Sequence, residues 1–213
     1  MTQAAFVTLL EGAWTTAWIS GVAIALGVPL GLVLALLRET RIPVVEQLLV
    51  LYVSLGRATP LVTLVLFIFV GAPAFGVPLD RYTAAILTLV LNTAAFNAEV
   101  WRASIRSFPR EQVDAARAAG MTRSLVFRRI MIPQLWITSL PGLVNEMTLL
   151  IKASPAIAVI GIVDLTRVTN RIAAVTYEPL PPILAAAALY MLVIGVLVRL
   201  QRVCDVRARR LAM

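Results

Sequence analysis

Residues 107–134 read SFPREQVDAARAAGMTRSLVFRRIMIPQ, and this polar and basic stretch lies between two long apolar runs. Connections between elements are usually short, so a polar segment of this length indicates structure of its own. Pro109 suits the first turn of a helix, and Gly120 is the residue type that ends one in the left-handed conformation. Thr122 can cap a second helix, which Pro133 is expected to stop or kink. The stretch therefore predicts two short helices, presented at an angle on one side of a membrane.

The composition of the chain is typical of an integral membrane protein. Of its 213 residues, 60% are hydrophobic and 14% are charged, and the mean hydropathy is +0.90. A soluble domain is about half apolar and about a quarter charged. The sequence has no histidine and one cysteine, which excludes histidine-dependent zinc sites, Ser-His-Asp triads and an intrachain disulfide. We predict no catalytic residue and no metal site on this chain.

Five apolar runs are long enough to cross a hydrocarbon core, which requires about 20 residues. The predicted spans are residues 12–37, 48–70, 82–101, 136–160 and 179–200. We therefore predict an all-α integral membrane protein with five transmembrane helices, forming a single domain over residues 1–213.

Small and aromatic residues indicate how the spans pack. In the first span, Gly21, Gly27 and Gly31 recur at nearly helical spacing and would let another helix approach closely. Tryptophans near the span ends are typical of anchoring at the membrane interface. The chain has four of them, Trp14, Trp18, Trp101 and Trp136.

The basic residues are distributed unevenly among the loops. The first loop, the long polar segment with the adjoining end of the third run, and the C-terminal tail carry 14 Lys and Arg, whereas the N-terminus and the other two loops carry 3. The more positive side of a membrane protein is cytoplasmic. Five spans then place the N-terminus outside, and the C-terminus and the long segment in the cytoplasm. Because the charge lies in loops between apolar runs, we predict no nucleic-acid partner.

The long polar segment also carries a motif with fixed spacing, formed by Asp114, Ala115, Ala116, Gly120, Ile130, Ile132 and Pro133. This pattern resembles the Glu-Ala-Ala (EAA) loop of the membrane subunits of ABC importers. It departs from the family's pattern at Asp114, where Glu is usual, and at Ile132, where Leu is usual.

Other stretches narrow the resemblance to the permeases of polar amino acid importers, the histidine/glutamine type. Residues 56–61, GRATPL, resemble their Arg-Gly-Thr-Pro-Leu segment. Residues 145–152 resemble their fourth helix, although this chain continues Ala-Ser-Pro-Ala where the family commonly has Asp-Thr/Ser-Ser-Leu. Residues 159–167 resemble the external helix that follows. The resemblance covers nearly the whole chain, from about residue 12 to residue 202.

The resemblance implies the membrane-spanning subunit of an ATP-driven importer of a polar or charged amino acid, located in the bacterial inner membrane. Its implied partners are two ABC ATPase subunits, a second permease chain, identical or homologous, and an external solute-binding protein, with the bilayer around them. Since the chain has no G-x-x-x-x-G-K-[ST] phosphate loop, we predict that it is not an enzyme and that ATP and Mg bind to the partner ATPase. The alternative is an ion-gradient-driven secondary transporter or another polytopic membrane protein.

In the importer interpretation, the two-helix segment over residues 107–134 couples the spans to the ATPase. The predicted coupling residues are Glu111, Asp114, Ala115, Ala116, Gly120 and Arg123. Glu111 and Asp114 place negative charge near the positive end of the first short helix. The alternative is a helix at the lipid surface, because Arg is attracted to anionic headgroups.

Charged residues within the spans are candidates for a substrate site, because a charge at bilayer depth costs about 2.5–3.5 kcal/mol on insertion scales. Arg57, Glu146 and Lys152 are such residues, and Glu146 and Lys152 do not share a helix face. Glu146 could bind an ammonium group while Arg57 or Lys152 binds a carboxylate. The alternatives are an interhelical ion pair, or Lys152 extending to the membrane surface.

The predicted substrate-binding residues are therefore Arg57, Thr59, Asn145, Glu146, Lys152 and Ser154. Thr59 is included because Pro60 breaks the helix beside it, and a broken helix is tolerated where it lines a cavity. A plain proline kink is the alternative.

Two further groups of charges have simple interpretations. Glu99 and Arg102, at i and i+3, are expected to pair on one helix face. Asp164, Arg167 and Arg171 share a face of a helix outside the membrane and are candidates for contact with an external binding protein. A solvated face is the alternative.

Overall fold

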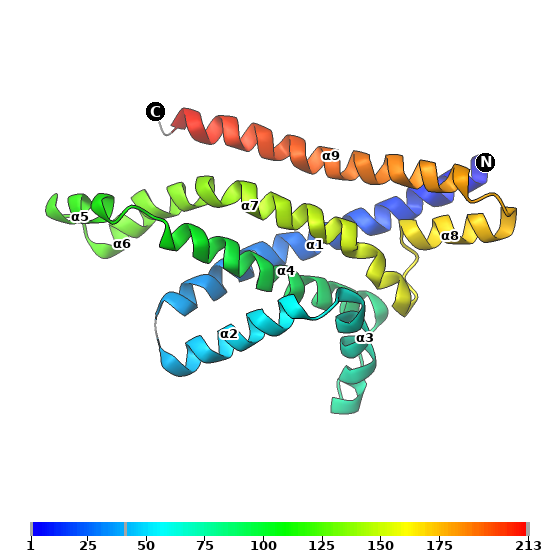
Figure 1. Cartoon of the computed structure of the whole chain (residues 1–213), viewed down its shortest axis with the longest axis horizontal. Coiled ribbons are helices and arrows are strands. Elements are labelled where there is room, and N and C mark those ends of the chain that lie inside the picture. The colour runs from blue at the N-terminus through cyan, green and yellow to red at the C-terminus, as the bar shows by residue number, and fades with distance from the viewer. Residues whose placement is uncertain (1, 41, 212–213) are drawn as a thin grey trace.

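Two long helices, α1 (Gln3–Glu39) and α4 (Arg81–Arg106), lie side by side and form the centre of the fold (Figure 1). The structure, a computed structural model, describes residues 2–40 and 42–211. Over these residues it is built from helices and their connections, without strands. Asp80 starts α4 by accepting hydrogen bonds from the backbone N–H groups of Tyr82 and Thr83.

Glycines allow the close approach of α1 and α4. A Cβ atom at Gly27 would lie 2.7 Å from Cγ2 of Thr93, and one at Gly31 would lie 2.8 Å from Cβ of Asn97. The predicted packing role is confirmed for these two glycines. It is wrong for Gly21, which is exposed and would have open space around a Cβ.

Trp101 corrects the expectation that all four tryptophans are interfacial. Its side chain is only 1% exposed, and its Nε1–H donates to the carbonyl of Val28 at 3.2 Å. Trp136 packs against it with ring centroids 5.7 Å apart. Trp14, by contrast, is 71% exposed. Trp101 therefore belongs to the contact between α1, α4 and α7 (Ile132–Ala153).

The second predicted span is not one straight helix. It is formed by α2 (Pro43–Ala58) and α3 (Leu61–Gly71), whose axes differ by 112°. The short 3₁₀ helix η1 (Ala72–Phe75) follows α3 and ends at Gly76, which is left-handed. Figure 1 shows α3 projecting away from the bundle of long helices. The bend is far larger than a proline kink, and it places α3 against α4 and the segment after α7.

The polar segment forms the first predicted short helix, α5 (Arg110–Ala118), and a second helix begins at α6 (Arg123–Val126). Gly120 has φ +84°, and the Thr122 hydroxyl accepts from the N–H of Leu125, as predicted.

Of the two outcomes predicted at Pro133, a stop or a kink, the stop does not occur. The chain runs from α6 through the π-helical turn η2 (Phe127–Met131) directly into α7. A proline ring normally meets the carbonyl of residue i−4 and leaves it without a donor. That carbonyl belongs to Arg129, which lies in the widened turn, so the helix continues past Pro133.

The fourth predicted span also differs from a single straight α-helix. The predicted span 136–160 consists of α7 and a 3₁₀ helix, η3 (Ser154–Ile160), which ends at the left-handed Gly161. It is followed by α8 (Leu165–Thr176) and by the long α9 (Leu180–Leu211). The N-terminus and α8 lie at one end of the molecule, and α5, α6 and the C-terminal end of α9 lie at the other (Figure 1).

Among the described residues, four helical segments are long and apolar enough to cross a membrane, namely Gln3–Glu39, Arg81–Arg106, Arg123–Ile160 and Leu180–Cys204. The bent α2–α3 pair makes a fifth if its two halves count as one span. The chain thus has an all-helical membrane fold, with a broken second element.

Candidate functional site

The break between α2 and α3 has its own hydrogen bonds. Thr59 donates both its N–H and its hydroxyl to the carbonyl of Leu55, at 3.0 and 2.7 Å. Pro60 has no N–H, so the carbonyl of Gly56 loses the donor that a continuing helix would supply. Asn92 of α4 supplies it instead, with Nδ2 3.1 Å from the Gly56 oxygen. The broken helix is therefore held open by a side chain from the central helix.

A pocket of about 190 Å³ opens at this break. Its polar lining comes from Thr59, Asn92, Thr93 and Glu146, with Phe96 and the leucines of α3 and α7 around them. The hydroxyl oxygen of Thr93 is buried and has no hydrogen-bond partner among the described residues. Glu146 forms no ion pair with any residue that the structure describes. A carboxylate and a free hydroxyl in one apolar pocket can bind a small ligand with a positively charged group.

Arg57 lies on the other side of Phe96. Its guanidinium carbon is 5.4 Å from the centroid of the Phe96 ring, which is a cation–π distance. Arg57 lines a second pocket of about 520 Å³ together with Glu99 and Arg102, and Phe96 lines both pockets. The structure therefore brings Arg57, Thr59 and Glu146 together around one aromatic ring.

The other three predicted substrate residues lie elsewhere. Asn145 and Lys152 are exposed and line neither pocket. Ser154 is fully buried, and its hydroxyl donates to the carbonyl of Ile151 at 2.8 Å. Its polar atom therefore serves the end of α7 rather than a cavity.

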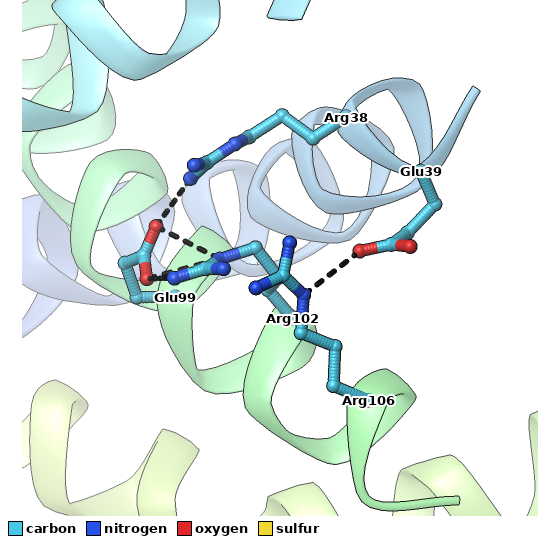
Figure 2. Close-up of polar contacts among 5 residues, drawn as sticks. All are labelled: Arg38, Glu39, Glu99, Arg102 and Arg106. Atoms are coloured by element: carbon cyan, nitrogen blue, oxygen red, sulfur yellow. Dashed lines mark hydrogen bonds and ion pairs between the residues drawn. The ribbon is translucent and has the colours of Figure 1, made fainter. Parts of the chain in front are cut away.

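A cluster of five charged residues joins the ends of α1 and α4 (Figure 2). One carboxylate oxygen of Glu99 accepts a hydrogen bond from Arg38 at 2.5 Å, and both oxygens accept from the guanidinium of Arg102. The predicted pair of Glu99 and Arg102 is thus confirmed. Arg106 lies 3.3 Å from Glu39 beside it. Because Arg38 and Glu99 are 61 residues apart, their contact ties the two central helices together at this end.

The predicted coupling residues gather on the short helices at the same end of the molecule. Glu111, Asp114 and Ala115 are exposed on α5, whereas Ala116 faces inward and is 7% exposed. Gly120 and Arg123 are exposed between and on the two helices. Gln134 at the start of α7 donates to Gln112 of α5 at 2.8 Å. This bond holds α5 against the root of α7 while its outer face stays open.

The residues proposed to meet an external protein differ in exposure. Asp164 is fully buried and caps α8 by accepting from the N–H groups of Thr166 and Arg167. Burial raises the pKa of its carboxyl, although those backbone N–H groups act in the opposite direction. The Arg167 side chain is half-buried and donates to the carbonyl of Ala158 at 2.6 Å. Of the three, Arg171 is the exposed residue.

Sequence reasoning missed four residues of this region, namely Asn92, Thr93, Phe96 and Arg38. The available signal was the pair of polar side chains Asn92 and Thr93 in the middle of an apolar helix, because polar groups inside a span mark functional sites. Phe96 and Arg38 carry no such signal in the sequence.

Comparison with known proteins gives a consistent result. Residues 27–210 match the model of a family described as binding-protein-dependent transport system inner membrane component. The chain is 35% identical over 195 residues to the octopine transport system permease protein OccM of Rhizobium meliloti, covering 87% of this chain and 80% of that protein. It is 32% identical over 190 residues to the arginine transport system permease protein ArtQ of Bacillus subtilis, with 89% and 87% covered.

A solved structure agrees with these matches. The crystal structure of an amino acid ABC transporter with histidines superimposes with a TM-score of 0.84 at 32% identity, covering 94% of each chain. The fold described above therefore resembles that of a known transporter chain over almost its full length.

Proposed function

Because this chain belongs to the family of binding-protein-dependent transport system inner membrane components, we propose that it imports a polar or charged amino acid and that the substrate passes through the pocket between Thr59 and Glu146. The chain is the permease subunit of an ABC importer and lies in the inner membrane with several apolar helices. Hydrolysis of ATP belongs to a separate subunit. The similar proteins are permeases for octopine and arginine, which supports an amino acid or a close derivative as substrate.

The observation that carries the substrate site is the meeting of a helix break with an unpaired carboxylate. The break brings the Thr59 hydroxyl to the pocket, α4 brings the Asn92 amide, and α7 brings Glu146. Glu146 would bind the ammonium group of an amino acid through a charge-assisted hydrogen bond. Arg57, held over Phe96 in the neighbouring pocket, would receive the carboxylate. Asn145, Lys152 and Ser154 lie outside this pocket and are not part of the proposal.

The proposed orientation has the N-terminus outside and the C-terminus in the cytoplasm. It rests on the 14 basic residues on one side of the five spans against 3 on the other. The N-terminus and α8 at one end of the molecule, and α5, α6 and the end of α9 at the other, support it (Figure 1). On this orientation the exposed Arg171 faces the external solute-binding protein.

The coupling proposal concerns α5 and α6. Their exposed residues Glu111, Asp114, Ala115 and Arg123 would dock on an ATPase subunit, with Gly120 setting the angle between the helices. We propose a complex of two permease chains, two ATPases that bind ATP and Mg, and the solute-binding protein. ATP would shift the spans between two states by binding one of them more tightly.

The test is purification from a native membrane, identification of the copurifying subunits, and uptake assays after reconstitution into liposomes. We expect a copurifying ATPase and uptake of an amino acid that requires ATP. Uptake that follows a proton gradient without ATP would contradict the proposal and support the ion-gradient alternative, which the similar proteins do not favour.

The substrate site has its own test in the same liposomes. Glu146→Gln removes the charge and keeps the shape, so the KM for uptake should rise about tenfold or more, as for the loss of one charge-assisted hydrogen bond. Glu178→Gln, at an exposed residue far along the chain, is the matched control. An unchanged KM in Glu146→Gln would remove Glu146 from the site.

A further inference from the structure

A third cavity, of about 660 Å³, lies at the end of the molecule that carries α5. Five separate parts of the chain form its walls: the end of α1, the start of α2, the end of α4 with the residues after it, α5 and η2. It is distinct from the pocket at Thr59 and Glu146, because the two share no lining residue. None of the substrate residues takes part in it.

Five of the nine residues that line this cavity are charged. Arg38, Glu39 and Arg106 belong to the cluster in Figure 2, in which Arg106 is held by Glu39 and Arg38 by Glu99. The remaining charged residues of the lining, Glu46 and Arg110, form no ion pair with any residue that the structure describes. The cavity therefore offers one acid and one base whose charges are not matched within the chain.

Two further features add to the positive part of the cavity. Arg110 is the first residue of α5, and Pro109 before it provides no side-chain cap, so the free N–H groups of this nine-residue helix begin at the cavity wall. The Nε atom of Arg38 is buried and finds no hydrogen-bond acceptor among the described residues. Free N–H groups beside guanidinium groups favour a phosphate oxygen.

The other four lining residues are apolar, namely Ile105, Phe108, Val113 and Met131. A cavity lined by both charged and apolar side chains, at the ends of two apolar helices, suits a ligand from the boundary between lipid headgroups and acyl chains. A free amino acid or inorganic phosphate would leave the apolar side chains without a partner.

We propose that this cavity binds a zwitterionic phospholipid whose headgroup ends in a primary ammonium group. The phosphate lies at Arg110 and the start of α5, the ammonium group donates to Glu46, and the glycerol with the first part of the acyl chains covers Phe108 and Met131. Glu46, the acidic residue of the lining that forms no ion pair with any described residue, favours a headgroup that also carries a positive charge. A quaternary ammonium group cannot donate a hydrogen bond to Glu46. The lipid would hold α5 to the ends of α1 and α2.

The test measures retained lipid by native mass spectrometry of the full chain, purified with its copurifying subunits and incubated with phosphatidylethanolamine, phosphatidylcholine or phosphatidylglycerol. Phosphatidylethanolamine should be retained about tenfold more tightly than the other two, the effect of one charge-assisted hydrogen bond. Glu46→Gln should remove this preference, whereas Arg110→Gln should lower the retention of all three lipids, because each carries the phosphate. Arg117→Gln, the same change on the same helix but outside the cavity lining, should keep it.

Several results would overturn the proposal. Among them are equal retention of the three lipids, an unchanged preference in Glu46→Gln, unchanged retention in Arg110→Gln, and binding of soluble glycerophosphoethanolamine as tight as that of the diacyl lipid. Retention that appears only after the copurifying subunits are removed would also overturn it, because the cavity would then belong to a protein contact. Size-exclusion profiles and thermal unfolding confirm that each variant is folded. None of these outcomes depends on the Thr59–Glu146 pocket, so the two proposals fail independently.

Discussion

Asn92 donates its side-chain amide to the backbone carbonyl of Gly56 across 3.1 Å. This carbonyl is the one that Pro60 leaves without a helical donor. A Cβ atom at Gly56 would lie 2.9 Å from Cβ of Ala95, one turn further along α4, so the break in α2 is pressed closely against the central helix. The hydroxyl of Tyr52 adds a second bond between these helices, to the carbonyl of Leu91 at 2.6 Å. The bend of 112° is thus stabilised by α4 as well as by the proline.

Asn92→Asp tests this relationship. The two side chains have the same shape, but an ionised Asp has no N–H and cannot donate to Gly56. We expect a loss of about 1 kcal/mol in stability, the typical contribution of one hydrogen bond, because the Gly56 carbonyl is partly buried and would lose its donor. Thermal unfolding in detergent, followed by tryptophan fluorescence, would measure it. Asn170→Asp makes the same change at an exposed position of α8 and should have little effect; equal shifts in both variants would contradict the role of the bond.

Gly31→Ala tests the contact between α1 and α4. The new methyl group would lie 2.8 Å from Cβ of Asn97 and 3.0 Å from the backbone nitrogen of Ala98, which cannot move without shifting the helix. Overpacking of this kind typically costs about 1–3 kcal/mol. The control is Gly21→Ala on the same helix, where the methyl group would meet nothing within 4 Å. Melting temperatures of the two variants should differ clearly, and equal values would show that α1 can move away from α4.

Gly120→Val tests the turn between α5 and α6. At φ +84° an L-residue costs about 1–2 kcal/mol, and the open space around Gly120 means that the cost is conformational rather than steric. We expect ATP hydrolysis by the complex to continue while amino acid uptake falls, because the angle between the helices changes.

The same turn provides graded comparisons. Gly120→Asn should retain more uptake than Gly120→Val, since Asn tolerates the left-handed region better. Gly195→Ala lies within α9, where a methyl group also meets nothing within 4 Å, and should behave like the unaltered chain. Full coupling in Gly120→Val would count against the turn's role in transmission.

Asp164 predicts a dependence of stability on pH. Burial raises the pKa of its carboxyl in the folded chain above the ordinary value of about 3.9 that applies on unfolding. A folded state that holds its proton more tightly loses stability as the pH rises from about 3.9 through the raised pKa. Asp164→Asn keeps a capping oxygen for Thr166 and Arg167 and removes the titration.

The variant and the unaltered chain should therefore differ most at neutral pH. We expect Asp164→Asn to be the more stable of the two at pH 7 and the difference to shrink as the pH falls toward 4. Unfolding temperatures of both proteins over this range would test the sign. A difference that grows toward acid pH would mean that the carboxylate is stabilised, not penalised, in the folded chain.

Much of the local structure could be predicted from the chain because its signals are local. The caps at Thr122 and the left-handed Gly120 each depend on a few adjacent residues, and the structure shows both. Whether Pro133 stops or kinks the helix could not be predicted from the sequence, because the outcome depends on the π-helical turn before it. The bend at Pro60 is larger than a proline alone would predict, because its size also depends on the contact with α4.

The candidate site was predictable only in part. Arg57, Thr59 and Glu146 stand out as polar residues in apolar runs, and the structure brings them to one region. Asn145 and Lys152 stand out in the same way but lie outside it, because a residue's side of a helix depends on how that helix is rotated against its neighbours.

The amino-acid sequence by itself determined the membrane class, the number of apolar runs, the bias of positive charge and the capped helices of the long polar segment. These follow from composition and from preferences within a few residues. Only the tertiary structure decided that Arg38 meets Glu99, that Trp101 is buried, and that the second run folds back at the break. Each of these depends on the rotation and approach of helices far apart in the chain, which no local pattern encodes.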